Sequence, residues 1–103
     1  MGDELSITQS VEGEKATITL VGNLSMISSP YLAEEVEKLE GVTSIDLDIT
    51  GIDYISQDGF DLLATMRDDL AAKGGKLVIM HPNEMLDEMI DDLDLKEQFD
   101  IVK

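Results

Sequence analysis

A polar turn with the sequence "SQDG", residues 56 to 59, separates an apolar, alternating stretch from an amphipathic one. The hydroxyl of Ser56 and the carboxylate of Asp58 are the groups in this turn that could take part in chemistry. Ser56 can accept a hydrogen bond or a phosphate group, whereas Asp58 carries a fixed negative charge. Both residue types are preferred at helix N-caps. The turn therefore predicts a helix start, with Asp58 as its N-cap and a charged surface around it.

Groups for catalysis or metal binding do not assemble elsewhere in the sequence. The chain has no cysteine, and His81 is its single histidine, so no thiolate or multi-histidine site for a transition metal is available. Residues 74–76 lack the remainder of a phosphate-binding loop, and residues 91–100 lack the ligand spacing of a calcium loop. We therefore expect no catalytic residue, no metal site and no cofactor.

Composition restricts the partner class. The 103 residues suit one domain, 1–103, and 7 basic against 23 acidic residues give a net charge of −16. This charge repels nucleic acid and anionic lipid, so we expect a protein partner and no membrane contact by the domain on its own. The longest purely apolar run is Leu77 to Met80, and residues 1–10 do not resemble a secretory signal. A cytoplasmic location is expected, and the oligomeric state is left open.

Alternating apolar residues predict strands at 5–11, 15–21, 44–50 and 76–80, with a short fifth strand at 99–102. Gly13 suits the turn of a hairpin between the first two strands. Helical spacing predicts helices at 29–40, 58–73 and 83–93. Ser29 is expected to cap the first helix, with Pro30 at its first position, and Gly74-Gly75 to end the second.

The predicted order β-β-α-β-α-β-α-β is typical of an α/β domain with right-handed crossovers. In residues 44–50 the apolar side chains point to one face, whereas Asp46 and Asp48 point to the other. One face of the sheet therefore lacks a helical layer. The expected fold is a two-layer α/β domain, with a sheet of four or five strands and the helices packed on one face.

Residues 48–60 resemble the signature of the STAS domain family, the sulphate transporter and anti-sigma factor antagonist family, which typically reads D-L-S-G-V-T-F-I-D-S-S-G-L. The segment "GNLSMISSPYL", 22 to 32, is similar to the family's G-R-L-D-T-A-T-A-P-E-L. The element order agrees across essentially the whole chain. Positions of equivalent or similar type within the signature are Gly51, Tyr54, Ile55, Gly59 and Phe60.

The departures from the family pattern concern its regulatory residues. In anti-sigma factor antagonists a partner kinase phosphorylates the Ser or Thr just before the glycine, and that position is Asp58 here. The family's frequent aspartate two residues earlier is Ser56, and the aspartate after G-R-L is Ser25. The resemblance thus implies a fixed charge at the phospho-acceptor position. Asp58 is then either a phosphomimetic or only a helix cap, and Ser56 either a displaced acceptor or a turn residue that bonds a nearby backbone group.

The resemblance implies a non-enzymatic regulatory domain in a partner-switching pathway, bound by an anti-sigma factor or serine kinase. The alternative is a STAS subunit of a transporter or another multiprotein assembly without phospho-switching. An enzyme that uses surface acids is a third, less favoured class. In each binding alternative the partner surface is expected near the start of the second helix. Its predicted residues are Ser25, Met26, Ile27, Ser56, Gln57, Asp58, Gly59 and Leu62.

Overall fold

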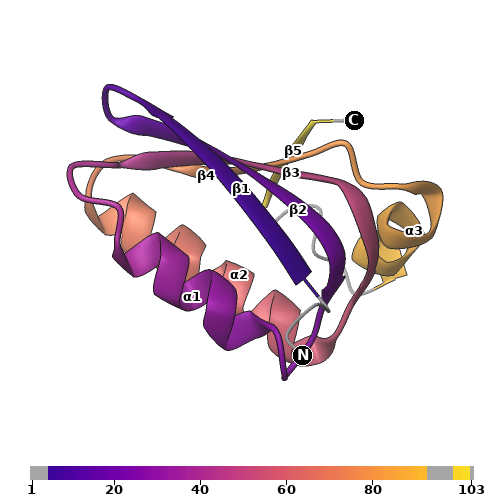
Figure 1. Cartoon of the computed structure of the whole chain (residues 1–103). Coiled ribbons are helices and arrows are strands. Elements are labelled where there is room, and N and C mark those ends of the chain that lie inside the picture. Colours follow the sequence, from indigo (N-terminus) through magenta and orange to yellow (C-terminus); the bar gives the residue numbers. More distant parts are fainter. Residues whose placement is uncertain (1–4, 93–98, 103) are drawn as a thin grey trace.

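The structure, a computed structural model, describes residues 5–92 and 99–102. Over these residues it contains a five-stranded sheet and three helices (Figure 1). The elements in chain order are β1 (Leu5–Glu12), β2 (Lys15–Leu24), α1 (Ser29–Glu37), β3 (Ser44–Ile55), α2 (Gln57–Ala72), β4 (Leu77–Met80), α3 (Glu84–Asp92) and β5 (Asp100–Val102).

The strands lie in the sheet in the order of the sequence, β1-β2-β3-β4-β5. The first pair is an antiparallel hairpin whose turn holds Gly13 at φ +62°, and the other three pairs are parallel. Helices α1 and α2 lie side by side under one face, and α3 lies at one end beside the curved part of β3 (Figure 1). Asp46 and Asp48 are partly exposed rather than buried beneath a helix. The two-layer α/β prediction is confirmed.

Strand β3 carries the centre of the core and continues to residue 55 instead of ending at 50. Ile45, Leu47 and Ile49 are buried with at most 1% of each residue exposed. The pairing with β2 then shifts register twice: the buried position Ile52 falls out of the original phase, and after the second shift the buried position Ile55 returns to it. The shifted phase hid this half of the strand from a simple alternation pattern. Each such buried side chain stabilises the fold by roughly 1.5 to 3 kcal/mol.

Helix α1 begins as predicted at Ser29 but ends at Glu37, because i to i+3 backbone bonds tighten its last turn. The predicted cap at Ser29 is wrong: Ser28 occupies the N-cap position, and no side chain caps this helix. Helix α2 starts one residue before the predicted 58 and ends at Ala72. Helix α3 runs from Glu84, and residue 93 of its predicted range lies outside the described residues.

The end of α2 is closed by the predicted glycine pair. Gly74 has φ +83°, and its N-H donates to the carbonyl of Ala71 at 3.0 Å. The N-H of Gly75 donates to the carbonyl of Leu70 at 2.9 Å. These two bonds form a Schellman motif, which satisfies carbonyls that the helix itself leaves unpaired. The motif turns the chain directly into β4.

Asp48, on the open face of the sheet, makes the fold sensitive to acid. The hydroxyl and the N-H of Thr50 donate to its Oδ1 at 2.6 and 3.0 Å. These two bonds, with a smaller contribution from His81, lower the pKa of Asp48 against the opposing effect of burial. A lowered pKa contributes stability above the unfolded-state value of about 3.9, and this stability is lost as the pH falls through the folded-state pKa.

We therefore expect Thr50→Val to lower the free energy of unfolding at pH 7 by less than about 1 kcal/mol, since the carboxylate is partly solvated. The difference in the free energy of unfolding between wild type and variant should become smaller as the pH is lowered from 5 to 2. Protonation of Asp48 removes the same contribution from the wild type. Urea unfolding across this range measures the gap. Thr50→Ser keeps the hydroxyl and should follow the wild type. A gap that stays constant with pH would contradict the assignment.

Candidate functional site

The start of α2 is fixed by Ser56. Its backbone is extended, with ψ 173°, and its Oγ accepts a hydrogen bond from the N-H of Gly59 at 3.2 Å. Ser56 is therefore the N-cap, and its bond to a nearby backbone group agrees with the turn-residue alternative. The carbonyl of Ser56 also accepts the first helical bond, from the N-H of Phe60 at 3.0 Å.

The expected cap role of Asp58 is therefore wrong. Asp58 lies inside α2, one residue after its first, because the hydroxyl of Ser56 starts the helix two positions earlier. Its carboxylate lies in the exposed first turn, where the positive end of the helix dipole favours a negative charge by about 0.3 to 1 kcal/mol. Gln57 is also exposed, and its side-chain amide donates to Asp61 at 3.2 Å.

The loop between β2 and α1 is held by a network of serines. The N-H of Ser25 donates to Ser28 Oγ at 2.8 Å, and this hydroxyl donates to the carbonyl of Asn23 at 2.7 Å. The hydroxyl of Ser29 donates to the carbonyl of Ser25 at 2.6 Å. Ser28 is 1% exposed, so its polar group is buried and paired. The network orders the loop that carries Met26 and Ile27.

Leu24 joins this loop to the start of α2. It pairs with Ile55 across the parallel strands, and its carbonyl accepts a bond from the N-H of Ser56 at 2.8 Å. Gly59 is buried against it, since a Cβ there would lie 2.7 Å from the Leu24 carbonyl oxygen. The absence of a side chain at residue 59 thus lets the helix approach β2 closely. The structure brings the two predicted segments, 25–27 and 56–59, to the same end of the molecule.

The tip of the loop exposes large apolar side chains. Met26 is 68% exposed and Ile27 is 66% exposed. Together with Asp58 they form what we call the α2-start surface. Leu62 lies elsewhere: it is partly buried against the core and lines a cleft between α1 and α2. The sequence analysis did not predict that Ser28 orders this loop or that Leu24 joins it to the start of α2. Ser28 could have been found as a candidate, because it directly precedes Ser29 and Pro30 at the helix start.

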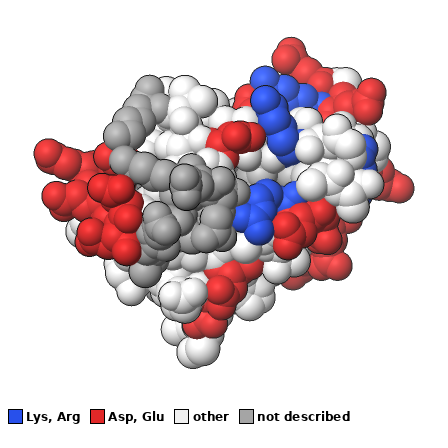
Figure 2. Space-filling model, turned by 180° about the vertical axis from the view of Figure 1, so that it is seen from behind, with Lys and Arg blue, Asp and Glu red and all other residues white. Residues whose placement is uncertain are grey.

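Charge at the described surface is predominantly acidic. Helix α3 carries five carboxylates, which form the dense acidic group seen from behind (Figure 2). Among the described side chains, no group of three or more His, Cys, Asp or Glu residues could hold a metal ion. Within residues 5–92 and 99–102, no helix combines the length and the apolar character needed to cross a membrane.

Several solved structures with the same arrangement of elements are anti-sigma factor antagonists. One from Mycobacterium paratuberculosis superimposes with a TM-score of 0.83 at 14% identity, over 97% of this chain and 86% of its own. The antagonist SpoIIAA in its unphosphorylated form gives a TM-score of 0.75 at 15% identity, over 95% and 87% of the two chains. The Bacillus SpoIIAA in its phosphorylated form gives 0.74 at 16%, over 95% and 92%. At these identities the likeness concerns the fold.

Sequence comparison identifies the family. No curated protein matches the chain by sequence. The family model described as "STAS domain" matches residues 6–103, which is nearly the whole chain. This match agrees with the fold, with the signature at 48–60 and with the element order. The chain belongs to the STAS domain family.

Proposed function

We propose that this STAS domain is a non-enzymatic regulatory domain that binds a protein partner through the α2-start surface. The observation that carries the proposal is the pair of exposed side chains, Met26 and Ile27, on a loop ordered by buried Ser28. Two large apolar groups held at two-thirds exposure suit the centre of a binding surface. The loop is already ordered, so docking loses less conformational entropy.

The proposed partner is an anti-sigma factor with serine kinase activity in a cytoplasmic partner-switching pathway. The fold likeness to SpoIIAA, solved with and without phosphate, supports this choice. In this chain Asp58 stands at the family's phospho-acceptor position. Its carboxylate supplies about −1 charge, whereas a phosphoserine supplies about −1.5 to −2. The domain would then resemble a permanently, weakly phosphorylated antagonist.

The position of the cap removes one structural explanation for Asp58, namely its use as the N-cap of α2. Ser56 already caps α2, so the cap does not account for the carboxylate at residue 58. Ser56 is not proposed as the acceptor, because its Oγ is engaged with the N-H of Gly59 at 3.2 Å and lies two residues before the family's acceptor position. Ser25 has no freely displayed hydroxyl either, since its Oγ accepts from the N-H of Ile27 at 3.2 Å.

The test is Asp58→Ser, which removes the fixed charge and restores a hydroxyl at the acceptor position. We expect affinity for the purified anti-sigma factor kinase of the same organism to rise about tenfold, equivalent to 1.4 kcal/mol. Phosphorylation of the new serine should lower the affinity again. The free energy of unfolding should change by less than about 1 kcal/mol, since only the dipole term is lost. Calorimetry at low salt, where charge effects are strongest, measures the affinities.

Asp58→Asn is the matched control, because it removes the charge with little change of shape and should also bind more tightly. Mass spectrometry after incubation with kinase and ATP should detect no phosphate on residues 56–58 of the wild type. Equal affinities for wild type and both variants would refute the phosphomimetic role. Stoichiometric phosphate on Ser56 would refute the assignment of residue 58 as the acceptor position.

A further inference from the structure

A second surface feature lies between α1 and α2, away from the starts of the helices. It is a cleft of about 250 Å³ lined mainly by apolar side chains. Met66 at its base is buried, and Val36 and Leu62 are partly buried against the core. These positions are fixed by packing, so the cleft exists before anything binds in it. Its volume is just below the range of about 300 to 1,000 Å³ usual for ligand sites and suits one or two side chains.

The rim of the cleft is acidic where the helix dipoles are negative. Glu37 is the last residue of α1, and Asp69 lies in the last turn of α2. The two helices run in the same direction, because each connects two parallel strands. Neither helix has a basic residue in its last turn. An acidic side chain at a helix C-terminus is destabilising by about 0.3 to 1 kcal/mol. A cation bound there would instead be stabilised by the two carboxylates and by the carbonyl groups at the helix ends.

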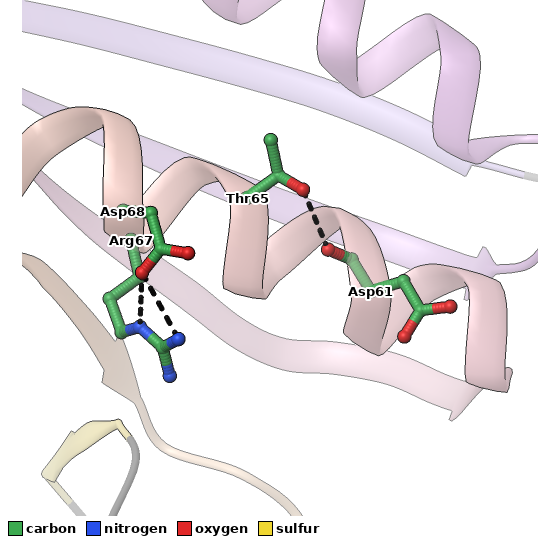
Figure 3. Close-up of polar contacts among 4 residues, drawn as sticks. All are labelled: Asp61, Thr65, Arg67 and Asp68. Atoms are coloured by element: carbon green, nitrogen blue, oxygen red, sulfur yellow. Dashed lines mark hydrogen bonds and ion pairs between the residues drawn. The ribbon is translucent and has the colours of Figure 1, made fainter.

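Two nearby basic residues, Lys38 and Arg67, pair with carboxylates that do not line the cleft. Lys38 donates to Glu35 at 3.2 Å. Arg67 pairs with Asp68 at 3.1 Å and extends from the side of α2 opposite Thr65, which faces α1 (Figure 3). Between them, α1 and α2 contain seven carboxylates and this single arginine. The cleft therefore combines an apolar floor with an acidic rim.

We propose that the α1–α2 cleft binds an amphipathic helix of a partner protein, with an apolar side chain on its floor. Lys or Arg residues beside that side chain would lie against Glu37 and Asp69. A helix presents such groups together at i, i+3 and i+4. A second copy of this chain is disfavoured as the occupant, because each copy carries a net charge of −16.

The proposal is independent of the α2-start surface. Asp69 follows Asp58 by eleven residues, which corresponds to about 16 Å along the helix. Leu62 on the cleft floor follows Asp58 by only four residues, so Asp58→Asn should weaken peptide binding less than the Glu37→Gln and Asp69→Asn pair does. Substitutions in the cleft lining should in turn leave unchanged the gain in kinase affinity that Asp58→Ser produces. The two proposals can therefore fail separately.

The probe is an 18-residue peptide with leucines at i, i+3, i+4 and i+7 spacing and lysines at most other positions. Titrated into the ¹⁵N-labelled full chain at 0.15 M salt, it should shift amide signals of residues 33–37 and 62–69. Ala33→Phe fills the cleft and should reduce affinity at least tenfold. Ala72→Phe adds the same ring to an exposed position of α2 outside the cleft lining and should bind like the wild type.

A second pair of variants tests the rim without adding bulk. Glu37→Gln with Asp69→Asn should weaken binding about threefold to tenfold, and both residues are exposed, so folding is retained. Asp53→Asn with Glu88→Gln is the control, because it removes the same charge from exposed sites that do not line the cleft. It should reduce the affinity for the peptide by less than half as much as the rim pair does.

Four results would overturn the proposal. A peptide of identical composition with its leucines scrambled should bind at least tenfold more weakly, and equal binding would show diffuse charge attraction. Shifts centred on residues 25–27 and 56–59 would place the peptide at the other surface. The absence of saturable binding, or self-association of the chain through the cleft in sedimentation experiments, would exclude a basic partner helix as the occupant.

Discussion

Gly75→Ala should lower the free energy of unfolding by about 3 kcal/mol or more, because overpacking against backbone cannot be relieved by a side-chain rotation. A Cβ at residue 75 would overlap the carbonyl group of Thr43, just before β3. Relief requires the α2–β4 connection to move away from that strand. For a domain with a total stability of about 5 to 15 kcal/mol, this is a large fraction. Denaturant unfolding, with the melting temperature as a second measure, tests it.

Gly74→Ala is the matched control at the adjacent position. Its φ of +83° strains an alanine by about 1 kcal/mol, but the space around its Cβ is empty. The variant should therefore be clearly less damaging than Gly75→Ala. A reversed order would mean that backbone conformation, and not the approach to Thr43, determines the requirement for glycine in this motif.

Gly59→Ala should be destabilising by about 2 kcal/mol, although alanine is favoured over glycine in helices by about 1 kcal/mol. The added Cβ would lie 2.7 Å from the carbonyl oxygen of Leu24 and 2.8 Å from Cγ2 of Ile55. Moving α2 outward would also weaken the bond from the N-H of Ser56 to the Leu24 carbonyl. Urea unfolding measures the first effect, and faster hydrogen exchange of the Ser56 amide measures the second.

Asp58→Ala serves as the reference for this experiment, since it introduces alanine at the neighbouring exposed position. It should change the stability by less than about 1 kcal/mol, because loss of the dipole interaction is offset by helix propensity. If Gly59→Ala is as stable as Asp58→Ala, helix α2 can move away from β2 at little cost. The close approach would then not explain the glycine.

The fold was largely predictable because its strands and helices have clean apolar periods. Ile45, Leu47 and Ile49 alternate without interruption, and Gly74 with Gly75 marks the end of a helix. The prediction failed where the period changed phase, in the second half of β3. A register shift depends on how two strands pair, and one strand's sequence does not contain that information.

The candidate site was predictable only in part. The resemblance placed Asp58 at a helix start, but the choice between Ser56 and Asp58 as cap depends on a single hydrogen bond to Gly59. Helix ends are uncertain by one or two residues when several adjacent side chains can cap. The cleft with Glu37 and Asp69 was beyond prediction, because it arises from two helices whose separation is set by the sheet beneath them.

The order of the strands has a consequence for how the domain forms. Each strand pairs with the strand next to it in the chain, and no strand is inserted between two that precede it. Every pairing therefore closes a short loop or a single crossover, which keeps the entropy of closure low and favours rapid folding. During synthesis, β1, β2 and β3 can assemble before β4 leaves the ribosome, and β5 completes an edge that is already in place.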